Sequence, residues 1–290
     1  MPINTYKYTF DYYNLRNTIF KLRDNYKDLT AFSIGNSTLG RGLFALGIGN
    51  PIGASIFIGG INGCDKISSA LLLNFTEQIL QALDKNNKIA GIDISAVIAK
   101  HGLIIIPCLN PDGQCIALGG AKKATFRQKF VQQLIDNNPT LPWTANAEGV
   151  QINMNFNAGW YNLYLQQNLN GIISPAPSGF AGFAPFSEQE TIAVSHLITA
   201  VNSSRCYEFT DGIPEIKYQY LLHTPEYSSL MAHILSSSYE FPVSTTPQND
   251  GSLGAWFQTQ FSSPAFQITV NDDVFSSSGL LEAMVLALMI

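Results

Sequence analysis

The chain has 290 residues, of which 46% are hydrophobic and 13% charged, and its formal net charge is −5. This composition excludes a disordered chain, which needs low hydrophobicity and high charge, and it supplies enough apolar surface for a sizeable core. The negative balance gives no basic footprint for nucleic acid, and no apolar run is long enough to span a membrane. We therefore expect one domain over residues 1–290, with neither nucleic acid nor a membrane span.

Helical and strand-like patterns alternate along the chain. Such alternation predicts an α/β fold with a mixed, mostly parallel twisted sheet and helices on both faces. Ligands bind these sheets at the carboxyl ends of the strands. In chain order, the expected elements are a helix (11–26), strands (29–34 and 42–48), a buried strand (54–58), a helix (68–83), a buried strand (101–107), a helix (187–201), a strand (205–210), a helix (225–237), a strand (266–270) and a closing helix (279–290).

Two short motifs carry local predictions. Ser187 has the position of a helix N-cap, and Glu190 three residues later would complete a capping box. Residues 110–113 read Asn-Pro-Asp-Gly, which predicts a tight turn that serves as scaffold.

The cysteines and the first residues bear on the class of protein and its location. The four cysteines form no CxxC pair, so a zinc ribbon is not expected. Residues 1–13 contain no apolar signal core and no cleavage pattern. The expected location is therefore the cytoplasm, with secretion through a removed leader left open.

Eight segments, taken in order, resemble motifs of the carboxypeptidase A type of zinc carboxypeptidase. The sequence is most similar to the bacterial branch of γ-D-glutamyl-diamino-acid peptidases, which cut peptidoglycan stem peptides. The most specific match is PCLNPDG, which resembles PxxNPDG. The resemblance runs from about residue 6 to 290 and implies a single zinc carboxypeptidase-like, phosphorylase/hydrolase-like domain. The matching segments are 33–41, 59–68, 107–113, 149–160, 185–191, 207–212, 251–256 and 266–270.

The resemblance implies a catalytic zinc held by two histidines and a glutamate. At those three positions the chain carries Asn62, Asp65 and Phe209. The amide oxygen of asparagine is a poor zinc donor, and phenylalanine cannot bind zinc. The last position can slip by one, to Glu208 or Thr210, because this segment has an extra residue. No zinc and no other cofactor are expected, although zinc is the metal of the family.

The catalytic positions implied by the resemblance are also changed. Thr269 stands at the position of the general-base glutamate, and threonine is no base at neutral pH. Met154 replaces the arginine that clamps a substrate carboxylate, and Pro142 lies near the position of the oxyanion arginine. Arg41 and Asn153 are retained. None of the catalytic residues is therefore expected to be intact.

The first functional hypothesis is an inactive member of this family that keeps its cleft for a peptide or a cell-wall (peptidoglycan) fragment. An apolar cleft with a few polar groups is the expected form of such a site. The residues expected to line the cleft are Arg41, Asn153, Met154, Tyr207, Phe209, Ser252 and Trp256, with the last two in a loop over 251–256.

Two other hypotheses remain open. One is an active peptidase with a rearranged metal site, built from Asp65, Glu208 or Asp211. Such an all-oxygen site would suit Mg²⁺ or Ca²⁺ better than zinc. The other is a structural or oligomeric scaffold, in which Met154 and Phe209 fill the old cleft.

Overall fold

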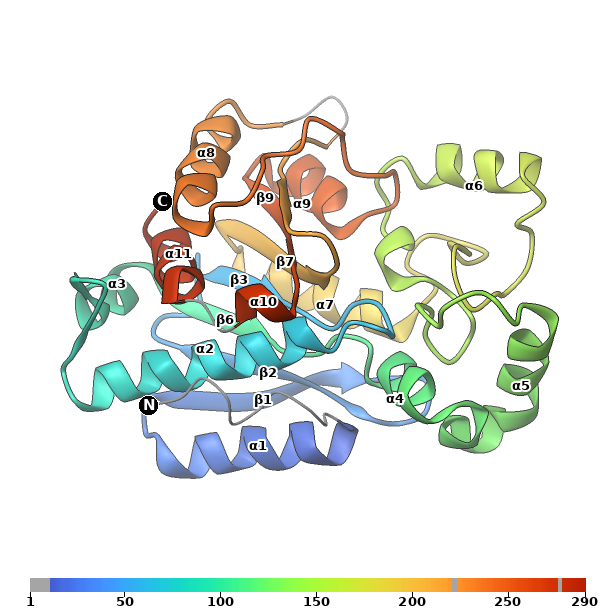
Figure 1. Cartoon of the computed structure of the whole chain (residues 1–290), viewed down its shortest axis with the longest axis horizontal. Helices are drawn as coiled ribbons and strands as arrows, with labels where there is room; N and C mark the ends of the chain where they lie inside the picture. Colours follow the sequence, from blue (N-terminus) through green and yellow to red (C-terminus); the bar gives the residue numbers. More distant parts are fainter. Residues whose placement is uncertain (1–10, 221–223, 276–277) are drawn as a thin grey trace.

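A mixed sheet of seven strands forms the centre of the structure (Figure 1), a computed structural model that describes residues 11–220, 224–275 and 278–290. Residues 6–10 of the resemblance lie outside these ranges. The strand order is β1-β2-β6-β3-β7-β9-β8. The strands are β1 (Leu29–Asn36), β2 (Gly42–Ile48), β3 (Ser55–Ile58), β6 (Leu103–Ile106), β7 (Arg205–Asp211), β8 (Glu215–Lys217) and β9 (Ala265–Val270).

The four central strands, β6, β3, β7 and β9, run parallel to one another, whereas β1, β2 and β8 pair antiparallel at the two sides. The short apolar strands β3 and β6 are buried along their whole length, as is typical of strands covered on both faces. The predicted α/β fold with a mixed sheet is confirmed. A separate two-stranded hairpin consists of β4 (Lys88–Ile89) and β5 (Ile92–Asp93).

Helices cover both faces of the sheet (Figure 1). Apolar side chains of α1, α2, α3, α8 and α11 share one core cluster, and those of α7 and α9 share the cluster on the opposite face. The helices are α1 (Tyr12–Asn25), α2 (Ile67–Asp84), α3 (Ile94–His101), α4 (Pro111–Gly119), α5 (Gln128–Asn137), α6 (Trp160–Leu169), α7 (Gln189–Val201), α8 (Ser228–Tyr239), α9 (Leu253–Phe261), α10 (Asp272–Phe275) and α11 (Ser278–Met289), with 3-10 turns η1 (Ala121–Arg127) and η2 (Ile152–Met154).

The predicted helices and strands are all present, but three local predictions are corrected. Residues 110–113 form no isolated turn, because Asn110 caps helix α4 by accepting a hydrogen bond from the Gly113 amide at 2.8 Å. The predicted capping box is absent: the Ser187 hydroxyl donates to Glu188, and Glu190 is buried beside Asn146. The expected loop over 251–256 contains the first turns of α9.

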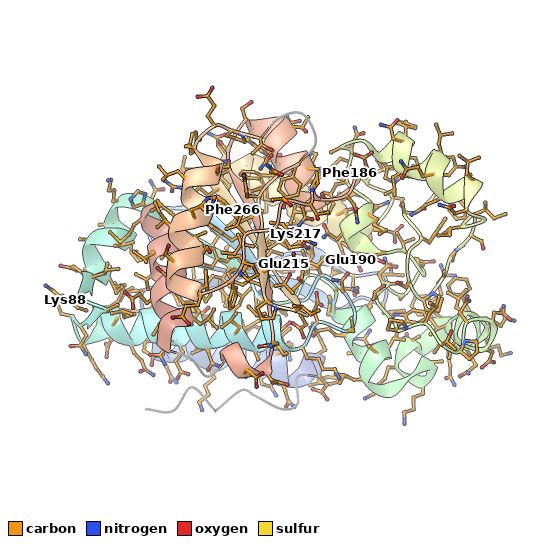
Figure 2. All side chains as sticks on the ribbon, turned by 45° about the horizontal axis from the view of Figure 1, so that its top comes forward. Lys88, Phe186, Glu190, Glu215, Lys217 and Phe266 are labelled. Atoms are coloured by element: carbon orange, nitrogen blue, oxygen red, sulfur yellow. The ribbon has the colours of Figure 1, made fainter. Side chains whose placement is uncertain are left out.

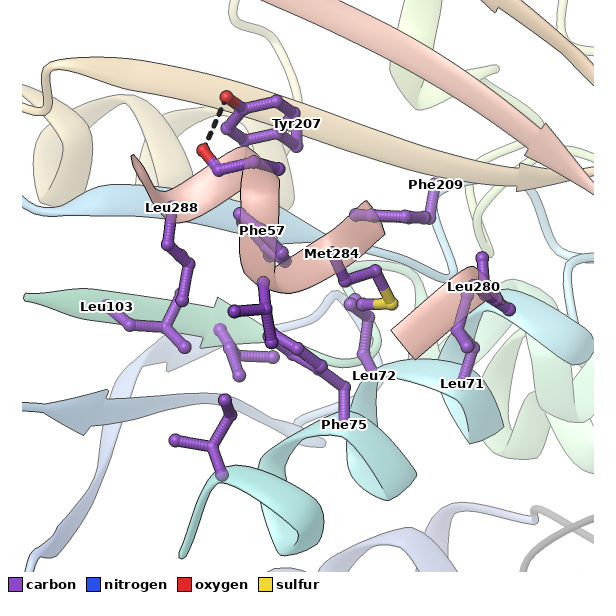
Figure 3. Packing of buried hydrophobic residues seen from close by; sticks show 14 of the residues in the cluster. Phe57, Leu71, Leu72, Phe75, Leu103, Tyr207, Phe209, Leu280, Met284 and Leu288 are labelled. Carbon is purple, nitrogen blue, oxygen red and sulfur yellow. Dashed lines mark hydrogen bonds between the residues drawn. The ribbon is translucent and has the colours of Figure 1, made fainter. Parts of the chain in front are cut away.

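The side chains of β7 alternate between the two cores. Tyr207 and Phe209 point into the cluster beneath α2 and α11, where the Tyr207 hydroxyl donates to the Ala287 carbonyl at 2.7 Å (Figure 3). Glu208 and Thr210 point to the opposite face, because successive side chains of a strand face opposite ways. The alternation therefore puts Glu208 and Thr210, and not Tyr207 and Phe209, on the face of the sheet where a pocket lies.

Candidate functional site

A polar pocket with a volume of about 180 Å³ lies on the face of the sheet that Glu208 occupies. Its walls come from the segment after β3, from η2, from β8 and β9, and from residues 246–252. Much of the wall is made of side-chain amides. The six carboxamide residues of the lining are Asn62, Gln151, Asn153, Gln248, Asn249 and Gln267.

Several residues singled out in the sequence meet in this pocket. Asn62, Asn153, Met154 and Ser252 all line it, although they come from three distant parts of the chain. Ser252 also caps α9, because its hydroxyl oxygen accepts a hydrogen bond from the Ala255 amide at 3.3 Å. Because most of the lining side chains are polar, the pocket is polar and not the apolar cleft that the sequence predicted.

Tyr207 and Phe209 do not line the pocket, and their expected place in the cleft is corrected. Both are fully buried on the other face of the sheet, and both pack on Phe57 with ring centroids 4.9 and 5.5 Å away, respectively. Tyr207 also stacks on Phe266. The period of two along β7 fixes this result, because the odd-numbered side chains share the core face.

Trp256 and Arg41 also lie away from the pocket. The Trp256 ring is buried against Phe156 and Phe186. Arg41 donates to the fully buried carboxylate of Asp112 at 2.6 Å and to the Lys123 carbonyl at 3.0 Å. Its guanidinium therefore joins the β1–β2 turn to α4 and is already engaged, through one nitrogen with the Asp112 carboxylate and through the other with a backbone carbonyl.

Asp65 and Asp211 meet at the end of the central strands, where backbone amides surround them. Asp65 Oδ2 accepts hydrogen bonds from the Asn62 amide at 3.0 Å and from Asn62 Nδ2 at 3.1 Å. Asp65 Oδ1 accepts a third hydrogen bond from the Asp211 amide, at 3.3 Å. Both oxygens of Asp65 are thus used within the protein.

Asp211 caps helix α2 from a distant strand. Its carboxylate accepts hydrogen bonds from the amides of Lys66, Ile67 and Ser68 at 2.6, 2.8 and 2.9 Å. Amides at the start of a helix have no acceptor within the helix, and the side chain of Lys66 at the N-cap position supplies none. Asp211 therefore satisfies donors that would otherwise lack a partner. A carboxylate at a helix N-terminus is also favoured by the helix dipole.

Burial raises the pKa of both carboxyls in this pair. The pKa of Asp65 lies well above its usual value because of burial and of the adjacent Asp211 charge. Burial also raises the pKa of Asp211, but its three amide donors oppose that rise. The three amide donors at the N-terminus of α2 favour the charged form of Asp211, whereas burial and the neighbouring Asp211 charge disfavour a charge on Asp65.

Glu208 lies directly beneath the pocket lining. Its Oε1 accepts hydrogen bonds from Asn153 Nδ2 at 2.6 Å and from Gln267 Nε2 at 3.0 Å. Its Oε2 is buried and has no hydrogen-bond partner among the described residues. Burial raises the pKa of Glu208 to about 7, although the Gln267 bond and the Lys217 charge act in the opposite direction.

The positions that correspond to the base and the oxyanion arginine hold no catalytic group. Thr269 is buried on β9, and its hydroxyl lies 3.4 Å from that of Thr210 on β7. Pro142 is exposed and stands outside the pocket lining. Neither side chain can take a proton from water at neutral pH.

The other residues of the pocket lining were not singled out in the sequence; they are Gln151, Lys217, Thr246, Pro247, Gln248, Asn249 and Gln267. Gln267 had a usable signal, because polar and apolar residues alternate through Phe266-Gln267-Ile268-Thr269-Val270. Lys217 comes from β8, a strand that the sequence did not predict, where it pairs with Glu215 at 2.8 Å (Figure 2).

The donor set at the expected metal positions does not fit zinc. Asn62 turns its Nδ2 toward Asp65, Asp65 is surrounded by N–H donors, and Phe209 faces the core. A zinc ion needs several lone pairs aimed at one point. Over residues 11–220, 224–275 and 278–290, no three His, Cys, Asp or Glu side chains converge so as to hold a metal ion.

Within the same ranges, no helix combines the length and apolar character needed to cross a membrane. The described cysteines are free, and three of the four are buried.

The zinc carboxypeptidase family profile matches residues 15–247. The gamma-D-glutamyl-L-diamino acid endopeptidase 1 of Lysinibacillus sphaericus is 25% identical over 262 residues, which are 89% of this chain and 65% of that protein. The chain thus spans less than two thirds of that relative's length.

Solved structures show the same fold. The carboxypeptidase A of Helicoverpa armigera superposes with a TM-score of 0.74 at 14% identity, over 98% of this chain and 73% of that one. The murein-tripeptide amidase MpaA of Escherichia coli O157 superposes with a TM-score of 0.56 at 20% identity, over 90% and 92%. Since the family profile covers most of the sequence, the chain belongs to the zinc carboxypeptidase family.

Proposed function

We propose that this chain is a family member without zinc and without peptidase activity, which binds a peptide or a peptidoglycan fragment in the polar pocket. The observation that carries the proposal is the set of hydrogen bonds around Asp65. Its two oxygens accept N–H groups from Asn62 and Asp211, where a metal ligand would aim a lone pair at the metal. This arrangement supports the loss of the metal on chemical grounds.

The residues at the two positions that correspond to the general base and the oxyanion arginine cannot take part in zinc hydrolysis. A hydrolase of this class needs a metal to lower the pKa of water and a base to take its proton. Thr269 and Pro142 supply neither a base nor a cation. The pocket nevertheless keeps many hydrogen-bonding groups, which is consistent with binding.

The class of ligand is inferred from the relatives. One is named for gamma-D-glutamyl-L-diamino acid peptides, and a structural neighbour for murein tripeptide. A ligand of that kind is rich in amide groups, and the carboxamides of the pocket offer both donors and acceptors to such groups. We extend the ligand class to this chain as part of the proposal.

The two alternative hypotheses meet specific obstacles. A rearranged metal site from Asp65, Glu208 and Asp211 would have to break the cap of α2, because Asp211 accepts three amides there. A scaffold with a cleft filled by Met154 and Phe209 keeps only Met154 at the pocket, because the Phe209 ring packs in the core on the other face. Neither alternative gains support from the geometry.

The test combines metal analysis, an activity assay and a binding measurement on the full chain. The zinc content is measured by elemental analysis after purification without chelators. The dipeptide γ-D-glutamyl-L-lysine is then titrated calorimetrically and also incubated with the protein, with and without added zinc. We expect substoichiometric zinc, binding of the dipeptide and no cleavage.

Two outcomes would contradict the proposal. One is stoichiometric zinc together with cleavage that a chelator abolishes. The other is the absence of measurable binding of the dipeptide.

A further inference from the structure

Helix α6 is attached to the rest of the protein by hydrogen bonds of its inner face. Gln167 is buried there: its Nε2 donates to the Gly179 carbonyl at 2.6 Å, and its Oε1 accepts from the Ala181 amide at 3.1 Å. Trp160 Nε1 donates to the Ala181 carbonyl at 3.0 Å. The inner face of α6 therefore contains a polar side chain where a surface helix ordinarily places an apolar one.

The outer face of α6 is apolar. Tyr161, Leu165 and Leu169 follow one another at intervals of four residues, so they form one stripe along the helix. Their exposed fractions are 67%, 60% and 87%. Figure 1 shows α6 at the rim of the molecule, away from the sheet. Because contiguous apolar patches of this kind mark interaction sites, the stripe calls for a partner.

The size of the stripe fits a protein–protein interface. Since a large side chain has roughly 150–250 Å² of surface, the three exposed fractions leave about 400 Å² of apolar area in solvent. A stable interface buries about 800 Å² on each partner, of which about 60% is apolar. The stripe therefore supplies most of the apolar area that one partner contributes, and the exposed Asn162 and Gln166 beside it suit a polar rim.

The charge distribution selects the partner. Residues 149–187 contain no Asp, Glu, Lys, Arg or His, so the net charge of −5 is carried by the rest of the chain. A charged partner surface would lose its hydration against this face without gaining an opposite charge. A second copy of the chain brings an equally uncharged and apolar face. In a two-fold dimer, the same patch of each copy faces the other.

We propose that two copies of this chain associate through the outer faces of their α6 helices. The two-fold axis passes near Leu165, the middle residue of the stripe, so that the helices run antiparallel. Tyr161 of each copy then contacts Leu169 of the other, because a two-fold interface repeats every contact. This dimer is independent of the ligand proposed for the polar pocket.

The experiment measures the mass of the full chain by sedimentation equilibrium and by size-exclusion chromatography with light scattering. The protein concentration is varied from about 0.1 to 100 µM, which brackets the affinities of standard-size interfaces at their weak end. We expect a species of twice the chain mass of 31.7 kDa, with a dissociation constant of about 1 µM or below.

The Leu165→Lys variant tests the position of the contact. It places two like charges opposite each other at the axis and should weaken the dimer about 100-fold or more. Leu230→Lys is the matched control, because Leu230 is 65% exposed on another helix, α8. Leucine and lysine have similar helix propensities, so both variants should fold, which thermal unfolding verifies.

Three outcomes overturn the inference. One is a monomer over the whole concentration range. Another is a dimer that Leu165→Lys leaves intact, or that Leu230→Lys weakens to the same extent, because the contact then lies elsewhere. The third is an assembly larger than a dimer, which a closed two-fold contact does not form. Since the measured quantity is mass, failure of the proposed binding function leaves this inference standing, and the reverse also holds.

Discussion

The two faces of strand β7 show different uses of neighbouring side chains. On one face, Tyr207 and Phe209 fill the core, and Asp211 at the end of the strand caps α2. On the other face, Glu208 lies beneath the pocket and keeps one free oxygen. Asp211 accepts three backbone amides and serves the fold, whereas Glu208 holds two amides of the pocket lining in place through its other oxygen.

The largest expected effect tests the core face. Phe209→Ala should reduce the free energy of unfolding by about 3–5 kcal/mol, because the fully buried ring packs on Phe57 and its removal leaves a cavity. The measurement is urea unfolding followed by circular dichroism. Thr210→Ala, one residue along on the other face, should cost about 1 kcal/mol or less. Equal costs for the two variants would refute the assignment of the faces.

The cap of α2 is the next test. Asp211→Asn leaves one acceptor oxygen for three amides and should destabilise the protein by about 1–3 kcal/mol in urea unfolding at neutral pH. Asp28→Ala, at an exposed position, is the control and should stay within about 0.5 kcal/mol of the unaltered chain. A negligible effect of Asp211→Asn would mean that the cap does not contribute to stability.

The pH dependence of stability tests Glu208. Its pKa in the folded state is about 7, above its ordinary value, so the folded state holds this proton more tightly than the unfolded state. The resulting stability is fully present below about pH 4.5 and is lost as the pH rises through about 7. Its size is about 1–3 kcal/mol.

Urea unfolding from pH 4.5 to 8 should therefore show a steeper decline for the unaltered chain than for Glu208→Gln. Subtracting the two profiles removes the contributions of other buried acids. Parallel profiles would show that Glu208 is not buried as a raised-pKa acid.

The smallest expected effect concerns Asp65, whose pKa is raised by burial and by the adjacent Asp211 charge. Because both causes disfavour a charge at this position, Asp65→Asn should cost about 1 kcal/mol or less, which is smaller than the cost of Asp211→Asn. The two variants are compared in the same urea titration. A larger cost for Asp65→Asn than for Asp211→Asn would contradict this ranking.

Much of the fold could be predicted from the sequence. The apolar runs of β3 and β6 and the helical spacing of α2 are local signals, and their positions are confirmed. Helices α3 to α6, α9 and α10 were not predicted, and the first turns of α9 were expected to be a loop. Ser252 is a favourable N-cap residue, so that segment did contain a local helix signal.

The candidate site could be predicted only in part. Asn62, Asn153, Met154 and Ser252 were singled out and line one pocket. Arg41, Tyr207 and Trp256 were expected there and pack elsewhere, because their partners are Asp112, Phe266 and Phe156. Sequence motifs locate a segment at the edge of a sheet, but the face of each side chain depends on the strand register.

By itself, the sequence determined the family resemblance, the positions of the central strands and the lack of histidine at the expected zinc positions. These properties depend only on residue identity and on short local patterns of residues. The tertiary structure alone decided that Asp211 caps a helix whose first residues lie 143 to 145 positions away, and that Glu208 keeps a free oxygen beneath a polar pocket. Hydrogen-bond partners so distant in sequence are set by the packing of α2 against β7, which no local pattern encodes.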